Sequence, residues 1–244
     1  MQFQRPQHNI ILSALHSMDA DLLARTNCFF GGGTAIVLLN GEYRLSLDVD
    51  FLCSDVDGYR ELRSVLPDAG ASAIFGPGVE TLREFRADQY GIRGLVSLEG
   101  QRIKFEIVRE SRIPLEGSLV AELGVPVLSV EHQFAEKLLA NADRVLDKAV
   151  ANRDAIDLGY LVITHGCIPA EAIKIAEIAY GPAVFKAMVQ GVQRLEDKDL
   201  QRHAADTLEM SVESVGEAAR ALREAAQLAW GTDIPHPETE LPEP

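Results

Sequence analysis

A run of glycines followed closely by alternating acidic residues constrains this chain more than any other feature. Gly31-Gly32-Gly33 stands between the apolar segments 28–30 and 35–39. Glycine lets the backbone turn sharply and approach a ligand closely. The pattern therefore predicts a strand, a glycine turn and a short helix over 34–40, which Thr34 can cap. A helix N-terminus that opens from glycines has unpaired N–H groups and a partial positive charge, which suits a phosphate.

Two carboxylates, Asp48 and Asp50, follow on the segment 46–53, which we predict as a strand. Alternate side chains of a strand share a face, so Val49 and Phe51 point away from the two acids. Neighbouring carboxylates on a core sheet repel each other and lose solvation, and a bound divalent cation removes that penalty. Such carboxylates hold Mg²⁺ with phosphate substrates. Asp-x-Asp alone more often marks an exposed edge strand, but the preceding glycine turn favours the metal site.

A third carboxylate, Glu106, lies on the predicted strand 102–109, in which apolar and polar residues alternate. If this strand lies beside 46–53, Glu106 can reach the same metal ions as Asp48 and Asp50, or accept the proton of an attacking hydroxyl. The alternative is an exposed Glu106 next to Lys104 on a solvent-facing strand. The sequence leaves both alternatives open.

The pattern along the chain predicts an α+β fold followed by helices. We expect a catalytic domain over 1–126, a helical domain over 127–232 that closes the cleft, and a disordered, acidic, proline-rich tail over 233–244. Ser129 is expected to cap the first helix of the helical domain. The further expected strands are 81–87 and 90–98, and the expected helices are 6–26, 56–67, 129–146, 151–165, 169–180, 182–195 and 204–229.

Composition limits the classes of protein. The chain has 244 residues, of which 47% are hydrophobic, so a packed core is expected. No run of eighteen apolar residues exists and the N-terminus lacks the apolar core of a signal peptide, which predicts a cytoplasmic protein without membrane insertion. The three cysteines form no CxxC pair, and we expect Cys28 and Cys53 to pack on strands as small apolar residues.

The charge balance excludes one kind of partner. The net charge of −14 argues against sequence-independent DNA binding, which needs a basic face. A local basic cleft for an RNA acceptor is still compatible with the sequence, and so is a scatter of solvated charges. The basic residues concerned are Arg83, Arg86, Arg93, Arg102, Lys104, Arg109 and Arg112.

A second group of charged residues lies on the predicted helices. Lys137 could hold a triphosphate as a mobile point charge, with Asp154 or Asp157 holding it in place. The alternative is a set of salt bridges between helices, such as Arg144 with Asp154 or Arg153 with Asp157. Spacing alone favours the salt bridges.

Taken together, these blocks resemble the AbiEii/AbiGii toxin family of nucleotidyltransferases, the toxins of type IV toxin–antitoxin pairs. The first block also resembles the wider polymerase-β-like nucleotidyltransferase superfamily, which usually has Gly-Ser in place of Gly33-Thr34. The matching residues run in family order over 32–158. They are Gly32-Gly33-Thr34-Ala35, Arg44-x-Ser46-x-Asp48-x-Asp50-Phe51, Lys104-x-Glu106, Glu136-Lys137 with Ala140 and Arg144, and Arg153-Asp154-x-x-Asp157-Leu158.

The resemblance implies a small mixed sheet flanked by helices, a helical C-terminal domain, and NTP and Mg²⁺ as ligands. It implies that Asp48 and Asp50 bind the metal, with Glu106 as the less secure third carboxylate, and that Asp154 or Asp157 is a further active-site carboxylate. The residues that it places at the nucleotide are Gly32, Gly33, Thr34, Arg44, Ser46 and Lys137.

The expected reaction transfers a nucleoside monophosphate from an NTP to an acceptor hydroxyl. Related toxins modify RNA, in some cases the tRNA 3′ end, and many have a co-encoded antitoxin as partner. Two alternatives remain open: nucleotidylation of a small molecule or protein side chain, and a catalytically idle nucleotide-binding module.

Overall fold

The computed structural model describes residues 1–235, apart from the side chain of Pro67. Their contacts divide the chain into two compact units. Unit 1 comprises residues 1–42 and 46–133, and unit 2 comprises residues 43–45 and the chain from 134 onward. The three-residue segment 43–45 therefore belongs to unit 2, although the residues on both sides of it in sequence belong to unit 1.

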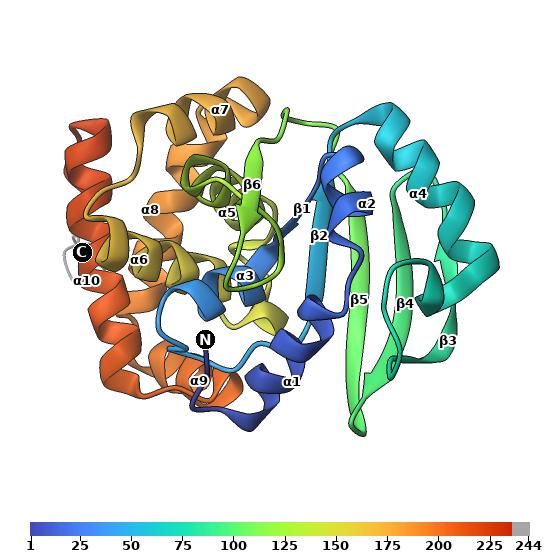
Figure 1. Ribbon diagram of the computed structural model, residues 1–244. Coiled ribbons are helices and arrows are strands. Elements are labelled where there is room, and N and C mark those ends of the chain that lie inside the picture. The colour runs from blue at the N-terminus through green and yellow to red at the C-terminus, as the bar shows by residue number, and fades with distance from the viewer. Residues whose placement is uncertain (236–244) are drawn as a thin grey trace. The chain divides into compact units, whose positions relative to one another are not determined.

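Unit 1 is built on a mixed sheet of seven strands in the order β3-β4-β5-β2-β1-β7-β6 (Figure 1). Strand β2 pairs in parallel with β5 and antiparallel with β1. The strands are β1 (Cys28–Gly31), β2 (Val49–Cys53), β3 (Glu80–Ala87), β4 (Gly91–Leu98), β5 (Gln101–Arg109), β6 (Gly117–Val120) and β7 (Val125–Leu128).

The core of unit 1 lies on one face of this sheet. Phe51 of β2 and Phe105 of β5 are fully buried in one cluster with apolar side chains of the helices α1 (Pro6–His16), α2 (Ala20–Arg25) and α4 (Val56–Ala69). Alternation then turns the polar residues of β2 and β5 to the other face. Cys28 and Cys53 are free thiols buried opposite each other on β1 and β2, which confirms the prediction that they pack on strands.

Unit 2 is helical. Its longest helix, α10 (Val212–Trp230), packs against α6 (Arg153–His165), α8 (Ala183–Glu196) and α9 (Lys198–Leu208) (Figure 1). A Cβ atom on Gly159 of α6 would lie 2.5 Å from the carbonyl oxygen of Ala218, so glycine permits the close approach of α6 and α10. The chain enters this unit along α5. The other helices are α5 (Val130–Arg144) and α7 (Ala170–Tyr180).

Two of the predicted helices are wrong because a polar residue begins a new helix within each. The helix expected over 6–26 is two helices, since Asp19 accepts the N–H of Leu22 at 2.9 Å and caps α2. The helix expected over 204–229 is also two, since Glu209 has a φ of 52° and Ser211 caps α10. Apolar periodicity continues across both breaks and conceals them.

The hairpin of β6 and β7 was not predicted. Pro126 lowers the strand propensity of β7, and the sequence beyond it reads as helical. In the structure β7 is fully buried and pairs in parallel with β1 and antiparallel with β6. Residues 236–244 of the predicted tail lie outside the described residues. Ile234, which the prediction also placed in the tail, is buried and only 1% exposed.

Two further local features concern the helices. Ser129 accepts the N–H of His132 at 3.4 Å, which confirms its predicted role at the start of α5. Among residues 1–235, no helix is both long enough and apolar enough to span a membrane.

We predict that Phe105→Ala lowers the free energy of unfolding of unit 1 by about 3–5 kcal/mol, the usual cost of deleting a buried aromatic ring. The Phe105 ring centroid lies 5.3–6.1 Å from those of Phe51, Phe75 and Phe85, so a cavity would open between several rings. Urea unfolding followed by circular dichroism measures the change. Leu82→Ala, at a side chain that is 47% exposed, is the control and should change stability by less than about 0.5 kcal/mol. Equal stability of the two variants would contradict the assigned core.

Candidate functional site in the sheet of unit 1

Asp50 and Glu106 lie side by side on the polar face of the sheet. The parallel pairing of β2 and β5 sets Asp50 opposite Glu106, and the antiparallel pairing of β2 and β1 sets Asp50 opposite Gly31. Register partners point to the same face, so the two carboxylates and the glycine form one row across three strands. The sequence left open whether the strand of Glu106 lies beside that of Asp50, and the structure shows that it does.

Asp48 lies just outside this row. Strand β2 begins at Val49, so the predicted strand 46–53 starts three residues too early. Asp48 is half-buried, and it precedes Asp50 by two residues along the chain. The buried partners Val49 and Phe51 confirm which face of β2 points to the core.

The glycine turn lies directly against Asp50. Gly32 begins the helix α3 (Gly32–Leu39) with a φ of 66°, a region that favours glycine. A Cβ atom on Gly32 would lie 2.9 Å from Oδ2 of Asp50 and 3.1 Å from its Cβ. Any larger residue at position 32 would therefore fill the space beside the carboxylate.

The hydroxyls of Thr34 and Ser46 meet near this turn. Their oxygens are 2.8 Å apart, although 12 positions separate them in sequence. Thr34 lies in the first turn of α3 and the helix has no side-chain cap, so its predicted capping role is wrong. The helix begins two residues earlier, at Gly32, where the positive φ favours glycine. The structure thus brings together two residues that we predict to bind the nucleotide.

His8 fixes the segment that carries Ser46. It is fully buried, its Nδ1 lies 2.8 Å from Oε1 of Glu42, and its Nε2 accepts the Ser46 N–H at 3.3 Å. An accepting Nε2 leaves the proton on Nδ1, which donates to Glu42. Burial works to raise the pKa of Glu42, but hydrogen bonds from the Gln4 N–H and from His8 hold it below its ordinary value. No sequence motif marked His8.

The residues around Gly32 fit a magnesium ion. Among residues 1–235, no three His, Cys, Asp or Glu side chains stand close enough to form a complete metal site. Mg²⁺ however usually takes only one or two carboxylates and completes its shell with substrate phosphates and water. Asp50 and Asp48 can supply that number, and the missing side chain of Gly32 leaves the position beside the Asp50 carboxylate to a ligand, because a Cβ atom would fill it. The donor chemistry and the space beside it both suit the ion.

Glu106 has cationic partners on the same face. Arg93 of β4 donates through Nε to its Oε1 at 2.7 Å, and Lys104 lies 3.5 Å from its Oε2. The Glu106 side chain is 15% exposed. The row of Asp50 and Glu106 therefore continues into basic side chains toward the sheet edge.

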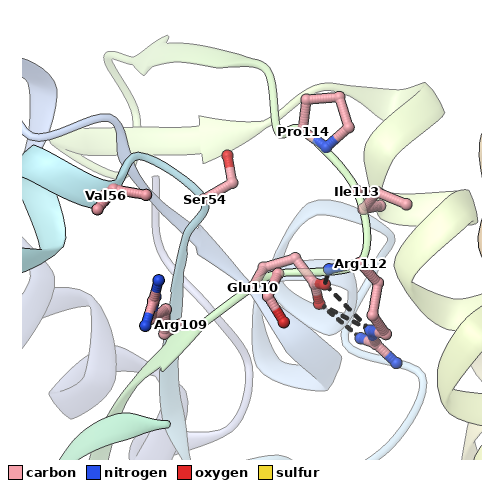
Figure 2. Close-up of a pocket in the computed structure, with 8 residues that line it drawn as sticks. Ser54, Val56, Arg109, Glu110, Arg112, Ile113 and Pro114 are labelled. Carbon is pink, nitrogen blue, oxygen red and sulfur yellow. Dashed lines mark hydrogen bonds and ion pairs between the residues drawn. The ribbon is translucent and has the colours of Figure 1, made fainter. Parts of the chain in front are cut away.

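A pocket of about 420 Å³ lies where β2 and β5 end. Figure 2 shows Ser54, Val56 and Arg109 on one side and Ile113 and Pro114 on the other. Between them, the Glu110 carboxylate turns to the Arg112 guanidinium and binds it at 2.6 Å (Figure 2). Two members of the predicted basic cluster, Arg109 and Arg112, thus line this pocket instead of the carboxylate row.

Unit 2 contains a buried network of ion pairs. Arg44 donates to both oxygens of Asp157, at 2.7 and 2.9 Å, and is 3% exposed. Lys137 lies 2.8 Å from Asp157 and 3.0 Å from Asp154. Arg144 donates to both oxygens of Asp154, at 2.6 and 2.8 Å. The Arg144–Asp154 salt bridge that spacing favoured is therefore present.

This network fixes the segment 43–45 in unit 2. Tyr43 donates to Asp157 at 2.6 Å, and its ring stacks on that of Tyr160 with centroids 3.6 Å apart. The Leu45 N–H donates to the carbonyl of Leu208. Direct phosphate binding by Arg44 would require its bidentate pair to open. The nucleotide-binding roles of Arg44 and Lys137 stay predictions.

The network keeps its acids ionised. Burial alone would raise the pKa of Asp157, but Arg44 and Lys137 bring it below its ordinary value. Burial likewise opposes ionisation of Asp154, and Lys137 and Arg144 shift its pKa far downward. Asp157 in turn raises the pKa of Arg44 despite the burial of the guanidinium.

The fold and the glycine turn against a sheet carboxylate agree with the family to which comparison with known proteins assigns the chain. Residues 15–228 match the family described as "Nucleotidyl transferase AbiEii toxin, Type IV TA system". The chain belongs to this family of nucleotidyltransferase toxins. No curated protein matches the sequence.

Two solved structures share the fold. The crystal structure of a candidate nucleotidyltransferase from H. pylori has a TM-score of 0.55 at 17% identity, covering 95% of this chain and 98% of that one. The structure of JHP933 from Helicobacter pylori has a TM-score of 0.53 at 16% identity, covering 94% and 96%. Both support the predicted fold class, a mixed sheet flanked by helices and followed by a helical region.

We predict that acid unfolds unit 2 through Asp154 and Asp157. Because their pKa values are lowered in the folded state, the stability they contribute is present above the ordinary value of 3.8 and is lost as the pH falls toward the folded-state values. Urea unfolding between pH 6 and pH 2 measures this loss. Asp154→Asn should weaken the acid dependence, whereas Asp199→Asn, at a side chain that is 90% exposed, should keep it. An unchanged pH profile in Asp154→Asn would refute this assignment.

Proposed function

We propose that unit 1 transfers a nucleoside monophosphate from an NTP to an acceptor hydroxyl, with Mg²⁺ at Asp48 and Asp50. The proposal refines the family assignment, and the approach of Gly32 to the Asp50 carboxylate is the observation that carries it. That approach leaves room for an ion or a phosphate where a side chain would otherwise stand.

In the reaction, the acceptor oxygen bonds to the α-phosphorus of the NTP and the bond from that phosphorus to the pyrophosphate oxygen breaks. When bound, the magnesium ion would neutralise charge on the phosphates and align them. The backbone N–H groups at the start of α3 can donate to a phosphate, and the helix dipole favours its negative charge. The hydroxyls of Thr34 and Ser46 can donate to phosphate oxygens. We propose that Glu106 takes the proton of the acceptor hydroxyl.

We propose RNA as the acceptor and an antitoxin protein as the partner. Membership in a type IV toxin–antitoxin family supports the partner. A cytoplasmic location follows from the proposed NTP and RNA substrates. The residues Gly32, Gly33, Thr34 and Ser46 form the proposed triphosphate site of unit 1.

We predict that Asp50→Asn lowers the rate of NTP transfer at least about 100-fold. Mutating a residue that only supports a metal ligand already costs about 10- to 100-fold in metal affinity or activity, and Asp50 is proposed to be a ligand itself. Incubation with each of the four labelled NTPs and total RNA measures transfer, and chelation by EDTA should abolish it. Asp57→Asn is the control, because that carboxylate is 87% exposed on α4. Thermal melting should show the same fold in both variants.

Separate acceptor pools distinguish the alternatives. If the label appears only in protein or only in small molecules, that pool contains the acceptor and RNA does not. NTP binding in calorimetry without turnover in any pool would identify an idle binding module. Full activity of Asp50→Asn would contradict the proposed site itself.

A further inference from the structure

The polar face of β3, β4 and β5 carries a group of basic side chains that the reaction itself does not use. We call it the basic face, and all its members are exposed at the surface. These members are Arg83, Arg86, Arg93, Arg102 and Lys104.

The strand register shows that these residues share a face with Asp50. Arg86 pairs with Arg93, Arg93 with Glu106, and Glu106 with Asp50, so one row crosses β3, β4, β5 and β2. Neighbouring strands lie about 4.8 Å apart, so the row covers roughly 14 Å from Arg86 to Asp50. The row therefore leads from the sheet edge to the proposed catalytic carboxylates.

The adjacent rows add further positive charge. Arg83 pairs with Leu95 and Leu95 with Lys104, while Ser97 links Arg102 to Glu80. Glu80, Glu106 and Asp50 are the acidic residues of the three rows, against five basic ones. On a chain with a net charge of −14, such a concentration of cations is a local exception.

The face also contains cations that the fold does not neutralise. Arg86 stands opposite Arg93, and like charges in register destabilise a sheet. Arg93 is balanced by Glu106 at 2.7 Å and Asp88 at 3.4 Å. Within the part of the chain that the structure describes, Arg83, Arg86 and Arg102 make no ion pair. Their charge is available to an anionic ligand.

We propose that the basic face binds the phosphate backbone of a single-stranded RNA and leads its end to Asp50 and Glu106. A basic surface that follows the backbone is how proteins hold single strands without reading their sequence. The hydroxyl to be modified must reach the carboxylate row, and the basic face is continuous with that row on the same sheet. This inference rests on the proposed function, because it names the surface that would hold the acceptor.

Binding of a fluorescent single-stranded RNA 20-mer, measured by anisotropy without NTP, tests the inference. The variant Arg83→Gln/Arg86→Gln/Lys104→Gln should bind at least tenfold more weakly at low salt. Its slope of log affinity against log salt should fall by about 2, since each lost single-strand phosphate contact removes about 0.7. The control Arg25→Gln/Arg60→Gln/Arg202→Gln removes the same charge from side chains that are 54%, 73% and 65% exposed, and should bind like wild type.

A charge-retaining variant separates binding from folding. Arg83→Lys/Arg86→Lys/Lys104→Arg should keep the RNA affinity within about threefold, because backbone phosphates are bound mainly through charge. Equal affinity of the Gln variant and its control would overturn the inference, and so would an acidic peptide of equal charge that binds as tightly as the RNA. RNA binding that depends on the basic face, without any NTP transfer, would uphold the surface and refute the proposed function instead.

Discussion

The close approach of the Gly32 backbone to the carboxylate of Asp50 is the constraint on which the account of unit 1 depends. A Cβ atom at position 32 would lie 2.9 Å from Oδ2, and the positive φ there already favours glycine. Strand β1 must pair with β2 in register for the turn to reach Asp50, and β2 must pair with β5 for Glu106 to stand beside it. The buried face of the same strands fixes that register, because a slip of one residue would turn Phe51 and Phe105 to solvent.

Charge has a different use in each unit. In unit 2 it is buried and compensated: Asp157 alone receives Arg44, Lys137 and Tyr43. Removing one member of such a network leaves a buried charge unpaired, so these residues specify how segment 43–45 packs. In unit 1 the cations of the basic face lie on an open side of the sheet, where they contribute little to stability. The buried ion pairs of unit 2 stabilise a specific packing, whereas the exposed cations of unit 1 are available to bind a ligand.

Local pattern predicted strands β1 to β5 of unit 1, because alternation of buried and polar residues directly reflects the faces of a sheet, but it missed β6 and β7. The pattern placed Glu106 near Asp50 only if their two strands are neighbours in the sheet. Strand order could not be predicted, because it depends on pairings between segments far apart in sequence. The buried contacts of His8 with Glu42 and of Arg44 with Asp157 could not be predicted, since a buried polar residue looks in sequence like any surface one. The breaks at Asp19 and Ser211 were missed because the apolar period of the helices continues across them.

The most direct test of the account compares NTP transfer by Gly32→Ala and Gly100→Ala. Both glycines have a positive φ, 66° and 80°, so alanine strains both, but only at position 32 would its Cβ meet Asp50. At position 100 it would meet nothing within 4 Å. We expect Gly32→Ala to lose on the order of 100-fold in transfer rate, the cost of a small misplacement at a reacting centre, and Gly100→Ala to keep its activity. Equal transfer by the two folded variants would contradict the account.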